Sequence, residues 1–410
     1  MADREFDVVV VGAGPAGLAA ACRAAECGKH VAMLDDNPQP GGQIWRGAAK
    51  EAAAWMRRAE RLGVEWIAGA RVFDAPETGR LAVETFEGEF RVGYRKLILA
   101  TGARERFLPF PGWTLPNVMG AGGLQALAKS GLPLAGKRVI VAGSGPLLLA
   151  VARYMKAHDV DVRLIAEQAS RAAVMRFALT ICPRKLMQAV ALRAGLLGVR
   201  YLTSCWPVSA QGREKLESVT LTRGNHTWTE ACDYLACGFG LIPNLELAEL
   251  LGCRTWFGGV HVDFYQETSV LGVYAAGETT GIGGLELSLV EGEIAGYSAG
   301  GNADRARTLF GVRASHQRFA KALEQAFALR DELRALPQSA TFVCRCEDVT
   351  MERVRACSNW REAKLHTRCG MGPCQGRICG GALEFLLGWR AESVRPPVLP
   401  ARVGSFTAST

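Results

Sequence analysis

The chain has 410 residues, of which 49% are hydrophobic and 21% charged, so we expect a globular protein of two to three domains and exclude a disordered chain. The formal net charge is +8, but no basic run with interleaved aromatics occurs, which predicts a solvated surface and no nucleic-acid partner. The polar start and the lack of any apolar run of about 18 residues predict a cytoplasmic protein without signal peptide or transmembrane segment, whose 13 cysteines are reduced thiols or metal ligands.

The first predicted elements form a nucleotide-binding unit. A buried strand at 6–11 runs into Gly-Ala-Gly-Pro-Ala-Gly at 12–17, and an Ala/Leu-rich helix follows. The first glycine permits a tight turn, the second lets the backbone approach a pyrophosphate, and the third lets the helix pack close to the strand. The helix start offers free N–H groups to phosphates. A strand at 31–34 then ends in an acid suited to ribose hydroxyls. The predicted contacts are Gly12, Gly14, Gly17 and Asp35.

A second copy of this unit follows further along the chain. A strand at 138–142 leads into Gly-Ser-Gly-Pro-Leu-Leu at 143–148, and a later strand ends at Glu167. Leu148 replaces the third glycine, and its bulk should hold the helix away from the strand. The acid favours a free ribose hydroxyl, hence NAD(H) or another adenine nucleotide over NADP. The alternative is a vestigial loop kept for packing. The predicted contacts are Gly143, Gly145 and Glu167.

Six cysteines lie between residues 344 and 379. Cys344 and Cys346 are two residues apart, so in an extended segment their side chains face the same way. The later Cys369, Cys374 and Cys379 lie in a glycine-rich loop that can bend around a metal centre. Thiolates at this density favour an iron–sulfur cluster. The alternatives are structural zinc, for which a Cys-x-Cys pair is tight, and free buried cysteines.

Three further segments resemble those of flavoproteins with two dinucleotide-binding domains, such as glutathione and thioredoxin reductases. They read Pro-Gln-Pro-Gly-Gly-Gln at 38–43, Leu-Ile-Leu-Ala-Thr-Gly-Ala at 97–103 and Val-Tyr-Ala-Ala-Gly-Glu at 273–278, with Glu in the last where Asp is usual. The resemblance implies an α/β fold in which the second dinucleotide-binding domain is inserted in the first, and it implies FAD at the first loop. The FAD contacts that it adds are Gly42, Gln43, Thr101, Gly102, Gly277 and Glu278.

The cysteine-rich end resembles the [2Fe–2S] domain of bacterioferritin-associated ferredoxins. The resemblance rests on Cys-Arg-Cys-Glu-Asp-Val-Thr at 344–350 and Gly-Met-Gly-Pro-Cys-Gln-Gly-Arg at 370–377. It implies Cys344, Cys346, Cys374 and Cys379 as the cluster ligands. Cys369 is then an unexpected extra cysteine and a candidate substitute ligand, and Cys357 is expected to be an ordinary core or surface thiol.

These observations predict a modular chain. We expect an FAD-binding domain at 1–112 and 255–300, an inserted second nucleotide domain at 113–254, a helical connector at 301–338, and a small C-terminal iron–sulfur domain with a tail at 339–410. The apolar residues of the connector recur at helical spacing, and Pro337 ends it.

The whole chain resembles the nucleotide-binding subunit of heteromeric amino-acid dehydrogenases, a group with hydrogen cyanide synthase, opine oxidase, and the multisubunit proline and hydroxyproline dehydrogenases. Besides the cluster motif, the resemblance rests on Val-Ala-Gly-Ser-Gly-Pro-Leu-Leu-Leu-Ala at 141–150 and Gly-Phe-Gly-Leu-Ile-Pro-Asn at 238–244. It implies an electron-transfer subunit whose partner, a flavoprotein resembling D-amino-acid oxidases, oxidises the amine. The same resemblance is compatible with an FMN between the subunits and with a further small subunit. It is also compatible with membrane association through partners and with a non-reacting ATP at the second loop.

The residues themselves assign no catalytic group. None of the six histidines stands in a pattern with an acid or a cysteine, and no Cys-x-x-Cys pair occurs, which counts against thioredoxin-reductase chemistry. A flavin exchanges electrons in pairs or singly, whereas an iron–sulfur cluster takes one at a time, so a chain with both is suited to electron transfer. The alternatives are a self-sufficient NAD(P)H-dependent reductase and a non-catalytic scaffold.

Overall fold

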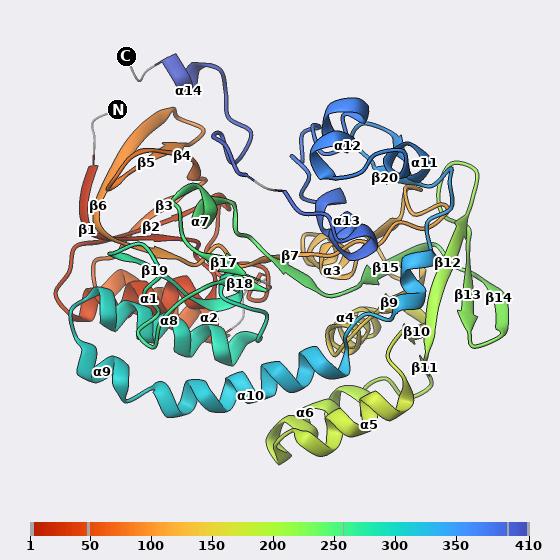
Figure 1. Ribbon diagram of the computed structural model, residues 1–410. Helices are drawn as coiled ribbons and strands as arrows, with labels where there is room; N and C mark the ends of the chain where they lie inside the picture. The colour runs from red at the N-terminus through yellow and green to blue at the C-terminus, as the bar shows by residue number, and fades with distance from the viewer. Residues whose placement is uncertain (1–3, 47–49, 257, 392, 408–410) are drawn as a thin grey trace. The chain divides into compact units, whose positions relative to one another are not determined.

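The computed structural model describes the chain in two compact units (Figure 1). The described residues are 4–46, 50–256, 258–391 and 393–407. The first unit comprises 1–104, 242–320 and 393–410, and the second comprises 105–241 and 321–392. This division is coarser than the four predicted domains, whose boundaries stay predictions.

The first unit is built on a parallel sheet. Its strands are β1 (Arg4–Val11), β2 (Val31–Asp35), β3 (Glu65–Ala68), β6 (Glu89–Leu99) and β19 (Val273–Ala275), in the order β3-β2-β1-β6-β19. The valines of β1 are buried on both faces, because Val8 and Val10 pack into one apolar cluster while Val9 and Val11 pack into another. This explains the unbroken apolar run in the sequence. The first half of β6 also pairs with the antiparallel strand β5 (Arg80–Glu84), which in turn pairs with the antiparallel strand β4 (Arg71–Glu77).

Helices α1 (Pro15–Glu26) and α8 (Leu285–Ala299) pack together on one face of this sheet (Figure 1). Two glycines of α8 permit the close approach. A Cβ at Gly292 would lie 2.2 Å from the Ala16 oxygen, and a Cβ at Gly296 would lie 2.3 Å from the Ala20 oxygen. Because no side chain fits there, α8 holds the start of α1 in place.

Smaller elements complete the first unit. They are α2 (Lys50–Arg61), α7 (Glu246–Leu250), β17 (Thr255–Trp256), β18 (Gly259–Val260), η1 (Gly277–Thr279), α9 (Ala303–Arg307) and α14 (Gly404–Thr407). The chain passes between the units through β7 (Ala103–Glu105), β16 (Leu241–Pro243) and α10 (Phe310–Ala326).

The second unit repeats the same plan. Its parallel strands lie in the order β11-β10-β9-β15-β8. They are β8 (Val118–Gly120), β9 (Arg138–Gly143), β10 (Asp161–Glu167), β11 (Arg200–Thr203) and β15 (Tyr234–Gly238). Helices α3 (Ala121–Lys129) and α4 (Leu147–Lys156) pack on this sheet. In the chain, the helices α5 (Arg171–Thr180) and α6 (Pro183–Ala194) lie between β10 and β11. The antiparallel strands β12 (Cys205–Gln211), β13 (Ser218–Arg223) and β14 (His226–Ala231) lie between β11 and β15.

The cysteine-rich segment has an apolar core of its own within the second unit. Its elements are η2 (Asp331–Ala335), β20 (Phe342–Cys344), β21 (Val349–Thr350), α11 (Met351–Arg355), α12 (Trp360–Thr367) and α13 (Cys379–Leu387). Val343, Val349, Val354 and Leu383 pack around buried cysteine side chains. The segment is therefore a small module built around its thiols.

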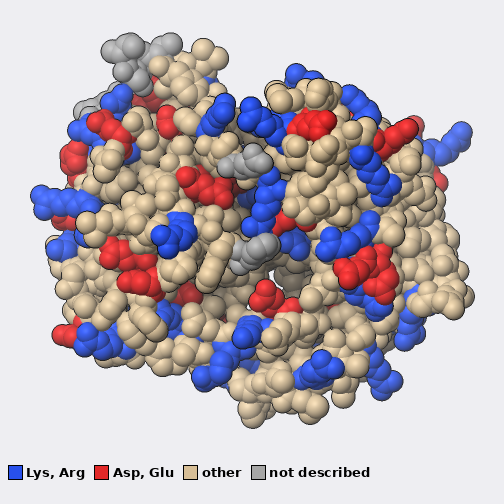
Figure 2. Space-filling view, in the orientation of Figure 1, with Lys and Arg blue, Asp and Glu red and all other residues tan. Residues whose placement is uncertain are grey.

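Basic and acidic side chains are interspersed over the face seen in Figure 2. This mixture agrees with the expected solvated surface on that face. None of the helices within the described residues is both long enough and apolar enough to cross a bilayer.

Candidate cofactor sites

The first glycine loop has one open position between two crowded ones. Gly12 has φ +106°, and a Cβ there would lie 2.2 Å from the Ala100 oxygen, while a Cβ at Gly17 would lie 1.8 Å from the Gly12 oxygen. By contrast, apart from its chain neighbours, no atom of the described residues lies within 4 Å of a Cβ at Gly14, the N-cap of α1, where none of their side chains caps the helix. Free N–H groups at the start of a helix beside open space suit an anion.

Asp35, at the end of β2, braces this loop. Its Oδ2 accepts the Ala13 N–H at 2.6 Å, and its Oδ1 accepts the backbone and side-chain N–H groups of Asn37 at 2.8 and 2.7 Å. The side chain remains partly exposed. Because each carboxylate oxygen has further lone pairs, the group can also accept from ribose hydroxyls.

The predicted segment after this acid lies on the glycine loop. The Gly41 N–H donates to the Ala13 oxygen at 2.7 Å, and Gly42, with φ +60°, would place a Cβ 3.0 Å from the Gly14 Cα. Gln43 is exposed. The structure therefore brings Gly42 to the open glycine.

Thr101 and Gly102, just after β6, are tied to two residues that the sequence patterns did not single out. The Thr101 hydroxyl lies 2.8 Å from the Thr279 hydroxyl and donates to the Asn244 oxygen at 2.8 Å. The Asn244 side chain donates back to the Thr101 oxygen at 2.9 Å, and its N–H donates to the Gly102 oxygen. Asn244 ends the family-like segment 238–244, but only the fold brings it to β6.

Gly277 and Glu278 follow β19 beside the start of α1. Gly277 has φ +78°, and its Cβ would lie 2.7 Å from the Ala16 Cβ. Burial raises the pKa of Glu278. Glu291 of α8, absent from the predicted set, accepts the Gly277 N–H at 3.0 Å and the Thr280 hydroxyl at 2.8 Å. Burial raises the pKa of Glu291 to about 7. Nothing in the sequence sets it apart, because α8 carries two further glutamates, Glu286 and Glu293.

The first site thus joins the carboxyl ends of four parallel strands. Residues predicted from four separate segments lie together at this edge of the sheet, where ligands bind in open α/β folds. The open glycine, the two partly exposed acids and the free helix start fit a dinucleotide. Their individual roles stay predictions.

The second glycine loop has similar packing but a buried acid. A Cβ at Gly143 would lie 2.1 Å from the Gly238 oxygen, just as a Cβ at Gly12 would lie close to the Ala100 oxygen. Leu148 is accommodated opposite Gly238, where a Cβ would lie 3.3 Å from the leucine Cδ2. Glu167 has no exposed surface and accepts the N–H groups of Gly145 and Ala169, each at 2.8 Å. Burial raises its pKa to about 7.

Residues 327–330, which we call the covering segment, lie on this second loop. Ser144 donates to the Phe327 oxygen at 2.8 Å, and the Phe327 Cγ lies 3.8 Å from a Cβ position at Gly145. The buried Gln168 donates to the Ala328 oxygen at 3.1 Å and accepts the Arg330 N–H at 3.2 Å. The covering segment therefore packs on the loop glycine Gly145 and on Gln168, the residue that directly follows the predicted ribose-binding acid.

Three buried cysteine thiols meet in the C-terminal module. The Sγ atoms of Cys344, Cys369 and Cys379 all lie within 4.8 Å of one another. The thiols of Cys369 and Cys379 and the N–H groups of Gly370 and Glu347 donate to Cys344, which lowers its pKa to about 2. Such a group of thiols suits a metal ion or cluster.

Cys346 and Cys374 form a second pair nearer the surface. The Cys374 N–H donates to the Cys346 sulfur, and the two thiols are hydrogen-bonded. A Cβ at Gly372 would lie 2.3 Å from the Cys346 Cβ, so the glycine loop wraps closely around this residue. Burial raises the pKa of Cys346, and the neighbouring Cys374 and Cys344 raise it further. The predicted ligands therefore lie in two groups: Cys344 and Cys379 in the buried group with Cys369, and Cys346 with Cys374 in the outer pair.

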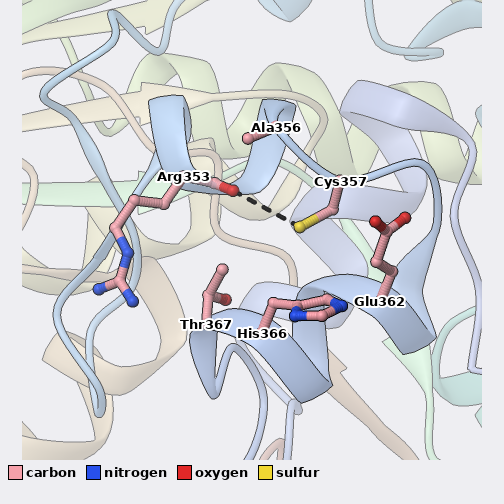
Figure 3. A pocket seen from close by; sticks show the side chains of 6 residues that line it. All are labelled: Arg353, Ala356, Cys357, Glu362, His366 and Thr367. Carbon is pink, nitrogen blue, oxygen red and sulfur yellow. Dashed lines mark hydrogen bonds between the residues drawn. The ribbon is translucent and has the colours of Figure 1, made fainter.

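Cys357 lies apart from these thiols, in a pocket of about 320 Å³ (Figure 3). Its Sγ donates to the Arg353 oxygen at 3.6 Å within the same helical turn, and burial raises the pKa of the thiol. His366 and Glu362 of α12 line the same pocket. This geometry agrees with an ordinary thiol.

Comparison with known proteins places this geometry in context. The family model "Pyridine nucleotide-disulphide oxidoreductase" matches residues 6–298. An opine oxidase subunit of Rhizobium meliloti (strain 1021) is 32% identical, over 97% of this chain and 98% of that protein. Hydrogen cyanide synthase subunit HcnB of Pseudomonas protegens is 31% identical, over 91% of this chain and 90% of that protein. The predicted resemblance to such subunits is confirmed.

Solved structures show the same fold. L-proline dehydrogenase from P. horikoshii has a TM-score of 0.68 at 19% identity, over 99% of this chain and 80% of that one. Thioredoxin reductase from T. acidophilum has a TM-score of 0.55 at 24% identity, over 76% of this chain and 99% of that one. The predicted fold class is confirmed.

Proposed function

We propose that this chain, which belongs to the pyridine nucleotide-disulphide oxidoreductase family, is the electron-transfer subunit of a heteromeric dehydrogenase for amino acids or related secondary amines. The chain is an FAD-dependent oxidoreductase. The observation that carries the proposal is the combination, in one chain, of an open dinucleotide cradle and a C-terminal module with three buried thiols within 4.8 Å of one another and a second cysteine pair. When bound, FAD exchanges electrons in pairs or singly and a [2Fe–2S] cluster exchanges them singly.

The first site is proposed to hold the FAD. Gly14 and the start of α1 would receive the pyrophosphate, because the loop is open there and the helix dipole favours an anion. Asp35 would accept from the ribose. Glu278, whose pKa burial raises, would accept from the hydroxyl-bearing ribityl chain. Thr101 and Gly102 would flank the flavin, held by Asn244.

The C-terminal module is proposed to hold a [2Fe–2S] cluster on Cys344, Cys346, Cys374 and Cys379. Two Cys thiolates per iron is the donor set that such a cluster requires, and the thiols are arranged as a buried group and an outer pair. The N–H groups of Gly370 and Glu347 donate to the Cys344 sulfur, which favours its thiolate form. Zinc would use the same donors, and the visible absorption of the purified protein separates the two.

Amine oxidation is proposed to take place in a partner subunit that resembles D-amino-acid oxidases. The proteins similar over nearly the whole chain are named as subunits of opine oxidase and hydrogen cyanide synthase. This supports a substrate of the proline, hydroxyproline, opine or glycine class. An FMN at the subunit interface and a further small subunit belong to the same proposal.

The test separates this function from a self-sufficient NAD(P)H-dependent reductase. The purified chain is mixed anaerobically with NADH in a stopped-flow spectrometer, and the flavin absorbance is followed. We expect no rapid bleaching by NADH, because the covering segment lies on the second loop. Dithionite should bleach both chromophores, which controls for their competence. Rapid bleaching by NADH alone would establish the reductase and overturn the proposal.

A further inference from the structure

The C-terminal module offers one more thiol than a [2Fe–2S] cluster can use. Such a cluster takes four cysteine ligands, two on each iron. This module contains the buried group of three thiols and the outer pair, five in all, and the resemblance leaves Cys369 without a place. The position of Cys369 is nevertheless among the most central of the five, because it has no exposed surface and its Sγ lies within 4.8 Å of both Cys344 and Cys379.

The backbone holds Cys369 rigidly in this position. Its N–H donates to the Thr367 hydroxyl at 3.2 Å, and that hydroxyl donates to the Ala363 oxygen, which fixes the end of α12. Arg368 adopts φ +67°, and Gly370 follows at φ +81° with the Trp360 ring 2.8 Å from its Cβ position. From this turn the Cys369 thiol lies against the thiols of Cys344 and Cys379.

The distances suit two of these three thiols on one iron. Two thiolates on a tetrahedral ion at about 2.3 Å lie roughly 3.8 Å apart, so Sγ atoms within 4.8 Å of one another need little movement to share an ion. Cys346 and Cys374 form their own pair, hydrogen-bonded sulfur to sulfur. The buried group therefore offers three thiols for the two ligand positions on one iron. The outer pair offers two thiols for the two ligand positions on the other iron.

We propose that Cys369 is a fifth ligand of the cluster: the inner iron, bound by Cys344, accepts either Cys379 or Cys369 as its second thiolate. The inference rests on the proposed function, because it requires an iron–sulfur cluster in this module. In the exchange, the Fe–S bond of Cys379 breaks and its sulfur takes up a proton, while the Cys369 thiol gives up a proton and forms an Fe–S bond. The cluster's charge and electron count do not change.

Alanine variants of the full-length chain test this proposal. The chains C379A, C369A and C369A/C379A are reconstituted anaerobically with iron and sulfide. We then measure iron and acid-labile sulfide per chain and the EPR spectrum after dithionite reduction. C379A and C369A should each retain about two irons per chain, with shifted g values in C379A, and the double variant should lose the cluster.

Two control variants locate the effect. C374A removes an outer ligand that has no spare neighbour in its pair, so it should lose the cluster even though Cys369 is present. C357A removes a thiol of the same module that lies outside the group, so it should match the wild type. The FAD content of every variant shows whether the chain has folded.

The outcomes distinguish this inference from the function on which it rests. If C379A loses iron and sulfide as completely as the double variant while its FAD is retained, Cys369 is not a ligand and the inference fails alone. If the wild-type chain itself takes up zinc but no iron and sulfide, the proposed cluster fails and this inference falls with it.

Discussion

Glu291 supports the first site from behind, through hydrogen bonds rather than through cofactor contact. One of its oxygens, Oε2, accepts both the Gly277 N–H and the Thr280 hydroxyl, so this buried carboxyl fixes the turn that presents Glu278. Burial penalises its charged form, which raises its pKa to about 7 from the ordinary 4.5. A single acid therefore couples the geometry of the turn to pH.

The stability that Glu291 contributes should fall as pH rises. Because its pKa is higher in the folded chain than in the unfolded one, the contribution is fully present below about pH 4.5 and is lost as pH rises through about 7. Glu291→Gln can keep both hydrogen bonds through its amide oxygen and cannot ionise. Between pH 5 and 8, the wild type should lose up to about 3 kcal/mol of unfolding free energy relative to E291Q.

Urea denaturation at several pH values, followed by flavin fluorescence, measures this difference. Glu51→Gln, on the exposed side of α2, is the matched control and should follow the wild-type pH dependence. Parallel curves for the wild type and E291Q would show that Glu291 does not titrate over this range in the folded chain.

At the scale of elements, the glycine loops before α1 and α4 are equivalent in the fold but differ in the residues that pack against them. Both begin with a glycine pressed against a backbone oxygen, both precede a helix, and both are braced by an acid from the next strand. Asp35 is partly exposed, whereas Glu167 has no exposed surface and the covering segment lies beside it. The same supersecondary unit can therefore present a nucleotide cradle or serve as a packing surface.

The wild-type chain is expected to bind no ATP at its second loop. Ser144→Ala together with Gln168→Ala removes the side-chain hydrogen bonds that hold the oxygens of Phe327 and Ala328 and the N–H of Arg330. This double variant should bind ATP measurably, because the covering segment is released. Equilibrium dialysis with labelled ATP, on chains already saturated with FAD, provides the measurement. Stoichiometric ATP binding by the wild type, abolished by Gly145→Leu, would contradict the expectation.

The features that could be predicted from the sequence are those that local chemistry dictates. Glycine loops, buried strands and the acids that end them are set by neighbouring residues, so the amino-acid order alone was enough to place Gly12, Asp35 and the four valines of β1. Asn244 could not be assigned a place, because its partner Thr101 is 143 residues away. Phe327 of the covering segment lies 183 residues from Ser144 in the sequence, and hydrophobic periodicity does not predict a contact between residues so far apart. The sequence shows Cys369 as an extra cysteine, but its central position depends on the left-handed turn at Arg368, which the sequence pattern does not predict.

At the scale of the whole molecule, the last described residues return to the first unit. The Val398 N–H donates to the Phe73 oxygen at 2.8 Å, and the Phe406 ring packs edge-on against the Phe73 ring. The Ser405 hydroxyl and the Arg402 N–H donate to Glu84 Oε2 at 2.7 and 2.8 Å. Glu84 is buried there at 9% exposure. The tail thus closes over β4 and β5, although it follows the cysteine module in the sequence.

Removal of residues 393–410 should therefore weaken the first unit and spare the cysteine module. Truncation takes away the Ser405 and Arg402 contacts to Glu84 and the ring that covers Phe73, so the surface of β4 and β5 beneath the tail is exposed to water. FAD should be released at a temperature several degrees lower, while iron per chain stays unchanged. Equal loss of FAD and iron on truncation would show instead that the tail stabilises both units together.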